Sequence, residues 1–256
     1  MNARKLFDLT GRTAIITGGS TGLGRQMAEG LAEMGMNLAI CARKKERCDE
    51  AAKQLATLGC DVLSFGCDVK EPTAVQAVVS ATAERFERID VLINCAGISW
   101  GATVEQMTLE QWNKVIDTNL TGTFLFAQAV GGMMQRQGRG KIINIASVAG
   151  LIGGSSDVQA IGYHASKGGV IAFTKDLACK WAQHNIQVNA IAPGWFPTHM
   201  SNWVLEHHKE SLLSKIPLHR FGGDHDLKGA AIFLASDASD YVTGHVLVVD
   251  GGQTAW

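Results

Sequence analysis

Short apolar segments alternate with longer helical patterns along the whole chain. Seven segments are apolar on both faces and often rich in valine and isoleucine, as buried strands are; they cover 13–17, 38–41, 62–66, 90–93, 141–146, 186–192 and 245–249. Helical patterns separate them, roughly over 22–35, 44–58, 72–88, 108–136, 159–184 and 226–236. This alternation predicts an α/β fold with a doubly wound, seven-stranded parallel sheet and helices on both faces.

The chain is expected to form one domain over residues 1–256. It contains no internal repeat, no low-complexity segment and no dividing linker, and it has only four prolines. With 46% hydrophobic and 18% charged residues it has ample material for a core. Its formal net charge of -1 argues against general attraction to nucleic acid or to a membrane surface, so the expected partner is a small molecule.

Neither a membrane segment nor a metal site is expected. No apolar run approaches the roughly 18 residues that a membrane span needs, and residues 1–11 lack the apolar core of a signal peptide, which predicts a cytoplasmic location. The six cysteines show no Cys-x-x-Cys pair and no histidine at metal-ligand spacing. We therefore expect reduced, mostly buried thiols.

A glycine-rich turn follows the first predicted strand and leads directly into a helix. It reads Thr17-Gly18-Gly19-Ser20-Thr21-Gly22-Leu23-Gly24. Glycines permit a tight turn and let the backbone approach a pyrophosphate, which then meets free N–H groups at the helix start. The first glycine interval is wider than in the Gly-x-Gly-x-x-Gly pattern. In this strand-turn-helix context the turn predicts a dinucleotide-binding Rossmann fold, and the alternative is a purely structural turn.

Tyr163 and Lys167 stand four residues apart in a predicted helix, which places them on one face. A tyrosine hydroxyl has an ordinary pKa of about 10, and a nearby cation favours its ionised form. The pair could therefore serve as an acid or base. Taken alone, the same spacing also fits an ordinary amphipathic helix with a buried tyrosine and a solvated lysine.

The glycine turn resembles the cofactor loop of the short-chain dehydrogenase/reductase family, and further motifs follow in that family's order. They are Asp68-Val69, Asn94-Cys95-Ala96-Gly97, Asn119, Ser147, Tyr163 with Lys167, Pro193-Gly194 with Thr198, and Val249-Asp250-Gly251-Gly252. Cys95 stands where the family usually has a second asparagine. The resemblance runs roughly from Gly11 to Gly252.

The resemblance implies a catalytic set of Asn119, Ser147, Tyr163 and Lys167. In such enzymes Tyr163 would exchange a proton with the substrate oxygen, while a nicotinamide exchanges a hydride with the carbonyl carbon. Lys167 would lower the pKa of the phenol and hold the nicotinamide ribose. Ser147 would hydrogen-bond the oxygen on which charge develops, and Asn119 would anchor a water on the proton path from Lys167.

The resemblance also implies a set of cofactor contacts. They are Gly18, Ser20, Thr21, Gly22, Leu23, Gly24, Arg43, Asp68, Val69, Asn94, Ala96, Gly97, Tyr163, Lys167, Pro193, Gly194, Phe196 and Thr198. Asp68 would meet the adenine amino group and Thr198 the nicotinamide carboxamide. Ala42 stands where an NAD-preferring site usually has a carboxylate, and Arg43 can grip a 2′-phosphate, so NADP(H) is the expected cofactor with NAD(H) possible.

Two segments should shape the substrate pocket. Ser147 and Tyr163 are sixteen residues apart, a longer interval than the family usually has, which predicts an enlarged loop containing Gly153-Gly154-Ser155-Ser156-Asp157. Residues 195–220 are expected to form a lid, and their aromatic content suggests a partly apolar pocket. The run Gly-Trp-Phe-Pro-Thr looks like a branch that includes both gluconate-type dehydrogenases and 3-oxoacyl reductases.

Three functions stay open on the sequence. The leading one is an NADP(H)-dependent ketone or 3-oxoacyl reductase, the second is a sugar-acid or polyol dehydrogenase, and the third is a non-catalytic dinucleotide sensor. A homotetramer is expected because the two long helical patterns carry apolar residues on several faces and the last strand should lie at the sheet edge. Those residues are Phe124, Phe126, Val130, Met133, Met134, Phe173, Leu177 and Trp181, with the tail Gln253-Thr254-Ala255-Trp256 as a second surface.

Overall fold

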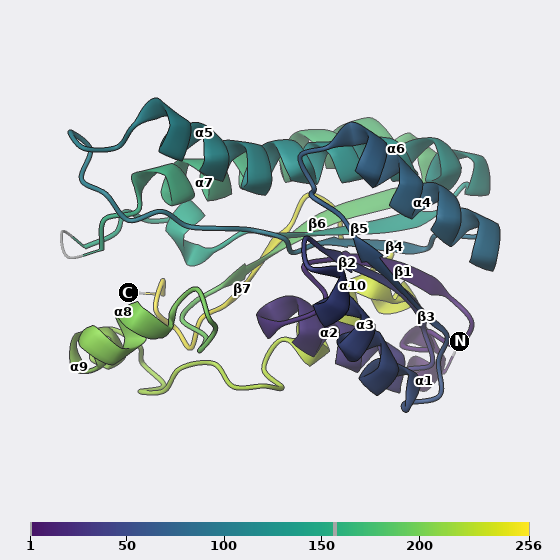
Figure 1. The fold of residues 1–256 in the computed structure, drawn as a ribbon. Helices are drawn as coiled ribbons and strands as arrows, with labels where there is room; N and C mark the ends of the chain where they lie inside the picture. The colour runs from purple at the N-terminus through teal and green to yellow at the C-terminus, as the bar shows by residue number, and fades with distance from the viewer. Residues whose placement is uncertain (1, 156–157, 256) are drawn as a thin grey trace.

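The computed structural model describes residues 2–155 and 158–255, and these form one seven-stranded parallel sheet between two layers of helices (Figure 1). The strands are β1 (Thr13–Thr17), β2 (Asn37–Ala42), β3 (Val62–Gly66), β4 (Val91–Asn94), β5 (Gly140–Ile145), β6 (Ile186–Pro193) and β7 (Val246–Val249). Their order is β3-β2-β1-β4-β5-β6-β7, and every neighbouring pair is parallel. The predicted fold class is confirmed.

Helices cover both faces of the sheet, so its central strands are buried on both sides. One layer holds α4 (Pro72–Phe86), α5 (Leu109–Ile116), α6 (Gly122–Gln137) and α7 (Ile161–Trp181). The opposite layer holds α2 (Gly22–Glu33), α3 (Lys45–Ala56) and α10 (Lys228–Ala235). Every residue of β1, β4, β5 and β6 is buried, which explains why these strands are apolar without alternation.

Each layer buries its own core against the sheet. Met27 and Leu31 of α2 pack with Leu234 of α10 on one face. Phe126 and Val130 of α6 pack on the other face. Phe126, Val130 and Met134 are fully buried there, so these three of the eight apolar residues belong to the core of the chain itself. Phe124, by contrast, is 43% exposed.

The helical pattern over 108–136 is not one α-helix, contrary to the prediction. A π-helical turn, Asp117–Thr121, separates α5 from α6. Its centre is the buried Asn119, whose side chain is bound by neighbouring segments rather than by its own helix. A π-helical turn inside a helix frequently marks a functional site.

Three short helices were not anticipated. They are α1 (Ala3–Leu6) near the amino terminus, and α8 (Asn202–His207) with α9 (Lys209–Leu213) within the predicted lid. The lid helices lie beyond the carboxyl end of the sheet, below the layer formed by α5 and α7 (Figure 1). Among the helices of the described residues, none has the length and apolar character that crossing a membrane requires.

The strand order reverses between β1 and β4, because the chain runs outward from β1 through β2 to β3 and then returns to β4. In parallel sheets the carboxyl ends of all strands meet at one edge, and ligands bind at such a reversal point. The glycine turn after β1 and the Asn94-Cys95-Ala96-Gly97 segment after β4 both lie at this edge. The fold therefore brings the two predicted cofactor motifs together.

Candidate active site

The glycine turn has the geometry of a close-packed cradle. Gly18 and Gly22 have positive φ angles of 68° and 54°, a backbone region that favours glycine. A Cβ on Gly24 would lie 2.3 Å from the carbonyl oxygen of Gly18, so the start of α2 packs directly on the turn. Thr21 precedes α2 and makes no side-chain capping hydrogen bond, which leaves N–H groups of the first helical turn available to an anion.

The other two predicted residues of this turn face inward. Leu23 is partly buried against the core on the α2 face, and the Ser20 hydroxyl is hydrogen-bonded to the Cys48 thiol. Ser20 therefore ties the turn to α3.

Thr17 holds the two cofactor motifs together and was missed by the sequence reasoning. Its Oγ1 accepts hydrogen bonds from the backbone N–H groups of Cys95 and Ala96, both at 3.0 Å. Asn94 supports the same corner from the other side, since its Nδ2 donates to Asn144 Oδ1 at 3.0 Å. The signal in the sequence was a threonine, a polar residue, at the end of an otherwise apolar strand and directly before the first glycine of the turn.

The residues expected at the adenosine end lie at the carboxyl ends of β2 and β3. Arg43 is exposed after β2 and, among the described residues, forms no ion pair with a carboxylate. Asp68 accepts a hydrogen bond from the Lys70 backbone at 3.1 Å. Val69 is buried under α6, where a Cβ on Gly122 would lie 2.6 Å from its Cγ2.

Tyr163 and Lys167 lie on the first turns of α7, and Ser147 follows β5 at the sheet edge. The Lys167 Nζ lies 5.6 Å from the centre of the Tyr163 ring, and Ser147 hydrogen-bonds the phenol. Lys167 Nζ also donates to the carbonyl oxygen of Ile145 at 2.6 Å. The structure thus brings together the tyrosine, lysine and serine that the sequence placed in one site.

Burial dominates the acid–base properties of this site. It raises the pKa of Tyr163, although the hydrogen bond from Ser147 opposes that effect. It also lowers the pKa of Lys167 to about 8. The expected lowering of the phenol pKa by Lys167 is therefore not seen in the isolated chain, and it stays a prediction for the cofactor-bound enzyme. The nearby Cys95 thiol has a pKa raised to about 11, so it remains protonated at neutral pH.

Asn119 is clamped by two other segments. Its Oδ1 accepts from the Ile98 backbone N–H at 2.8 Å, and its Nδ2 donates to the Ile98 carbonyl at 2.9 Å. The second Nδ2 hydrogen goes to Ser166 Oγ at 2.9 Å, and Ser166 in turn donates to the Tyr163 carbonyl at 2.8 Å. Both amide hydrogens of Asn119 are used, so its side chain can offer a water only the second lone pair of Oδ1.

Gly97 lies between Asn119 and Lys167. A Cβ at this glycine would be 3.3 Å from Asn119 Oδ1 and 3.7 Å from Lys167 Nζ. A larger side chain would fill the space that both polar groups border. The glycine in this motif therefore lets the backbone approach both Asn119 and Lys167.

The segment after β6 lies close to the glycine turn at Thr198. A Cβ on Gly22 would meet the Thr198 methyl group at 3.4 Å. Pro193 ends β6 beside β7, and the Gly194 N–H donates to Val249 at 3.0 Å. The Phe196 side chain is 4% exposed and packs in the core, so its side chain is not directed at a ligand.

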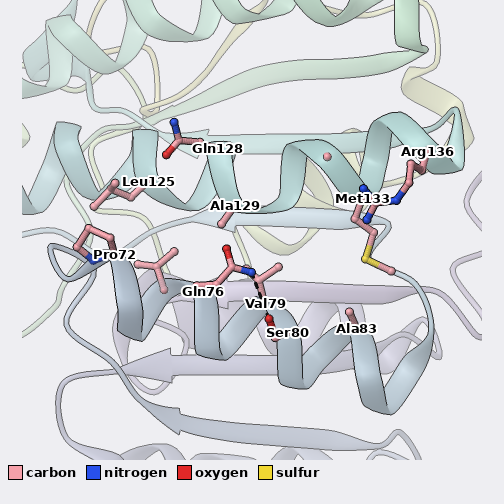
Figure 2. Close-up of a pocket in the computed structure, with 12 residues that line it drawn as sticks. Pro72, Gln76, Val79, Ser80, Ala83, Leu125, Gln128, Ala129, Met133 and Arg136 are labelled. Atoms are coloured by element: carbon pink, nitrogen blue, oxygen red, sulfur yellow. Dashed lines mark hydrogen bonds between the residues drawn. The ribbon is translucent and has the colours of Figure 1, made fainter.

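A groove of about 410 Å³ lies elsewhere, between α4 and α6. Figure 2 shows side chains of α6, including Leu125 and Met133, facing Gln76 and Val79 of α4 across it. None of the predicted site residues lines this groove. Within residues 2–155 and 158–255, no three histidine, cysteine or acidic side chains are arranged to hold a metal ion.

Known proteins resemble this chain over nearly its full length. A family model described as enoyl-(acyl carrier protein) reductase matches residues 18–254. The 3-oxoacyl-[acyl-carrier-protein] reductase FabG of Staphylococcus aureus is 38% identical over 243 residues, which cover 94% of this chain and 98% of that protein. The 2-dehydro-3-deoxy-D-gluconate 5-dehydrogenase of Bacillus subtilis is 40% identical over 250 residues, which cover 96% of each protein.

A solved structure adds the three-dimensional comparison. The gluconate 5-dehydrogenase of Burkholderia cenocepacia, in complex with NADP and tartrate, matches with a TM-score of 0.94 and 37% identity, covering 100% of both chains. These matches include the segments that carry the glycine turn and the Tyr163–Lys167 pair. The chain therefore belongs to the short-chain dehydrogenase/reductase family.

Proposed function

We propose that the protein is an NADP(H)-dependent oxidoreductase that interconverts a ketone and a secondary alcohol. The observation that carries this proposal is the contact between Ser147 and the Tyr163 phenol, with Lys167 Nζ 5.6 Å from the tyrosine ring. A phenol and a hydroxyl that meet at one point can both reach a single substrate oxygen. This is the arrangement that reduction of a carbonyl group requires.

The residues present fit a dinucleotide. Gly24 packs closely against Gly18, and neither glycine has a side chain that would cover the backbone of the turn. The amino-terminal end of α2 begins within this turn. Gly97 places no side chain of its own beside Lys167 Nζ. When bound, the nicotinamide cofactor supplies or accepts the hydride at the carbonyl carbon.

The protein's own residues handle the proton and the developing charge. Tyr163 donates its phenolic proton to the substrate oxygen during reduction and takes it back during oxidation. Ser147 hydrogen-bonds the same oxygen and stabilises the charge that develops on it. The buried ammonium of Lys167 favours the phenolate that forms after proton transfer.

Asn119 is proposed to anchor a water through the free lone pair of its Oδ1. This atom and Lys167 Nζ both border the open space at Gly97, so a water there could return a proton toward Lys167. The two hydrogen bonds with Ile98 and the hydrogen bond to Ser166 keep the amide in one orientation. A fixed acceptor costs little reorganisation during the reaction.

Preference for NADP(H) over NAD(H) is supported by Ala42 and Arg43 at the end of β2. Ala42 offers no carboxylate to the ribose 2′-hydroxyl, and Arg43 is exposed and free of acidic partners among the described residues. A guanidinium can bind a 2′-phosphate through two hydrogen bonds. The solved gluconate 5-dehydrogenase named above was crystallised with NADP.

The leading substrate class is a 3-oxoacyl thioester or a related small ketone, and a sugar acid is the second candidate. Similarity to FabG supports the first, and the 40% identity with a deoxygluconate dehydrogenase supports the second. A screen of NADPH oxidation over 3-oxoacyl thioesters, keto-sugar acids and cyclic ketones would separate them. No turnover with any class, despite tight NADPH binding, would instead support a dinucleotide sensor.

A homotetramer is proposed from the apolar surface of α6 and α7. Phe124 is 43% exposed and lies edge-on to Phe173, with 6.4 Å between the ring centres. β7 lies at the edge of the sheet, and Val248 on it is 37% exposed. Two separate self-complementary surfaces would build a closed tetramer. Trp256, predicted to contribute, lies outside the described residues.

Light scattering at micromolar concentration tests the assembly. A mass near four times the 27.3 kDa of the chain is expected, and a mass near 27.3 kDa would contradict the proposal. Phe124→Asp should reduce the mass, whereas Lys5→Asp on α1 should not. A cytoplasmic location is proposed because all six cysteines are unpaired, which suits a reducing compartment, and cell fractionation would test it.

A further inference from the structure

His164 contacts two parts of the segment that joins Ser147 to Tyr163. One contact is with Gly154 and the other is with Ala160. Residues 151–155, here called the pocket loop, follow a short 3-10 turn, Val148–Gly150. Leu151 and Ile152 both donate backbone hydrogen bonds to the Val148 carbonyl, at 2.9 and 3.0 Å. Ser147 itself is extended, and the chain that follows it forms a tight turn.

Gly150, directly before the pocket loop, packs on the backbone of α7. A Cβ on Gly150 would lie 2.6 Å from the Lys167 carbonyl carbon and 2.8 Å from the Gly168 nitrogen. No side chain fits in that contact. The loop is thus seated on the helix that carries Tyr163 and Lys167.

The second contact is between Gly154 and the imidazole of His164. A Cβ on Gly154 would lie 2.9 Å from His164 Nε2 and 3.1 Å from its Cε1. The φ angle of Gly154 lies outside the left-handed region, so the backbone itself does not require glycine there. The imidazole edge is what excludes a larger residue.

A hydrogen bond fixes the direction of that imidazole. His164 Nδ1 lies 3.0 Å from the Ala160 carbonyl oxygen, which can only accept, so Nδ1 carries a proton. Ala160 is the last residue before α7, and it forms a bridge with Ala102. His164 therefore holds the returning end of the loop by a hydrogen bond while its other edge supports Gly154.

We propose that His164 is a positioning residue that sets the shape of the pocket loop, and through it the affinity for the carbonyl substrate. The inference rests on the proposed oxidoreductase function. The pocket loop belongs to the segment that joins Ser147 to Tyr163, the two residues whose hydroxyls are proposed to be catalytic. The loop also carries two half-exposed apolar side chains, Leu151 at 43% and Ile152 at 44%. His164 itself takes no part in proton transfer, so a change in loop shape alters KM more than kcat.

A double-mutant cycle between His164 and Gly154 tests the contact. Gly154→Ala should raise KM for the carbonyl substrate about tenfold, with kcat within about threefold of wild type, because the added methyl overpacks the contact. Gly153→Ala is the matched control, since a Cβ at Gly153 meets nothing within 4 Å, and it should leave both parameters unchanged. In a His164→Ala background, Gly154→Ala should raise KM by less than about twofold.

Amide hydrogen exchange of residues 151–155 provides a readout that needs no turnover. Exchange should be faster in Gly154→Ala than in Gly153→Ala, and this difference should vanish in the His164→Ala background. Equal effects of the two glycine substitutions would overturn the proposal. So would an undiminished effect of Gly154→Ala without His164. Because the exchange measurement stands alone, the contact can fail or hold independently of whether a substrate is found.

Discussion

The amide of Asn119 is bound to the backbone of Ile98 by two hydrogen bonds, one in each direction, at 2.8 and 2.9 Å. This paired contact joins the π-helical turn to the segment after β4, next to the space where Gly97 borders Lys167. The amide thus satisfies both backbone groups of Ile98, as a neighbouring strand would do in a sheet. The interruption between α5 and α6 is the local consequence, because Asn119 must face inward at this point.

Ser166 completes this clamp, and Ser166→Ala should destabilise the protein by about 1–3 kcal/mol. The substitution leaves one buried Asn119 amide hydrogen without its acceptor and removes the donor to the Tyr163 carbonyl. Urea unfolding would measure the loss. Ser80→Ala, at an exposed position on α4, is the control and should change stability by less than about 0.5 kcal/mol. Equal stability of the two variants would show that the clamp contributes nothing.

Tyr163→Phe should lower kcat by about 10² to 10⁴ while leaving the fold and NADPH affinity intact. Only one hydroxyl is removed from a ring whose packing is otherwise unchanged. Steady-state kinetics and a fluorescence titration with NADPH would give the two quantities. Turnover within a few-fold of wild type would be incompatible with Tyr163 as the acid or base.

Arg43→Ala should weaken NADPH binding about tenfold to a hundredfold and NADH binding much less. The difference corresponds to a charge-assisted hydrogen bond to the 2′-phosphate. Dissociation constants for both cofactors would be compared with those of Arg4→Ala, an exposed arginine on α1. Equal weakening of NADPH and NADH would assign Arg43 a general role in the adenosine pocket.

Lys167→Met should stabilise the cofactor-free protein near neutral pH, even though it removes a proposed catalytic group. Burial lowers the pKa of Lys167 from 10.5 to about 8, so the folded chain resists holding this proton. Between pH 8 and 10.5 the unfolded chain binds more protons than the folded one, and wild-type stability rises with pH through that window. Below pH 8 the full cost is present, on the order of 3 kcal/mol, offset in part by the hydrogen bond to Ile145.

The advantage of Lys167→Met in unfolding free energy should therefore be largest at pH 7 and shrink toward pH 10.5. Urea unfolding of both proteins at several pH values would measure the gap. Lys175→Met, at an exposed position on the same helix, should show no such pH-dependent gap. A gap that is constant from pH 7 to pH 10.5 would mean that Lys167 is not buried as a charge.

The strands and the motifs were predictable because each rests on a local pattern. All seven predicted strands match the observed ones within one residue at either end, since buried parallel strands are short, continuous apolar runs. The π-helical turn was not predictable, because the residues that hold Asn119 are far away in the sequence, at Ile98 and Ser166. The role of Thr17 depends in the same way on its contact with Cys95.

The burial of the Phe196 side chain could not be predicted from its position in a cofactor motif. It stands in a predicted cofactor segment, yet its ring fills the core, where a Cβ on Gly222 would come within 2.2 Å of it. His164 shows the opposite case. Nothing in its sequence position distinguishes it from a solvated residue, and only its contacts with Gly154 and Ala160 give it a role.

The strand order has a consequence for how the protein is made. β1 pairs with β2 on one side, but its other neighbour, β4, comes only after roughly 70 further residues, which the ribosome adds in about 4–15 s. During that time the free edge of β1 is open to pairing with other chains. The four strands of the half that carries the glycine turn are made before Ser147 and Tyr163, whereas α10, which packs on α2, is made after them. A nascent chain of that length therefore has the glycine turn but lacks the helix that covers α2 in the finished protein.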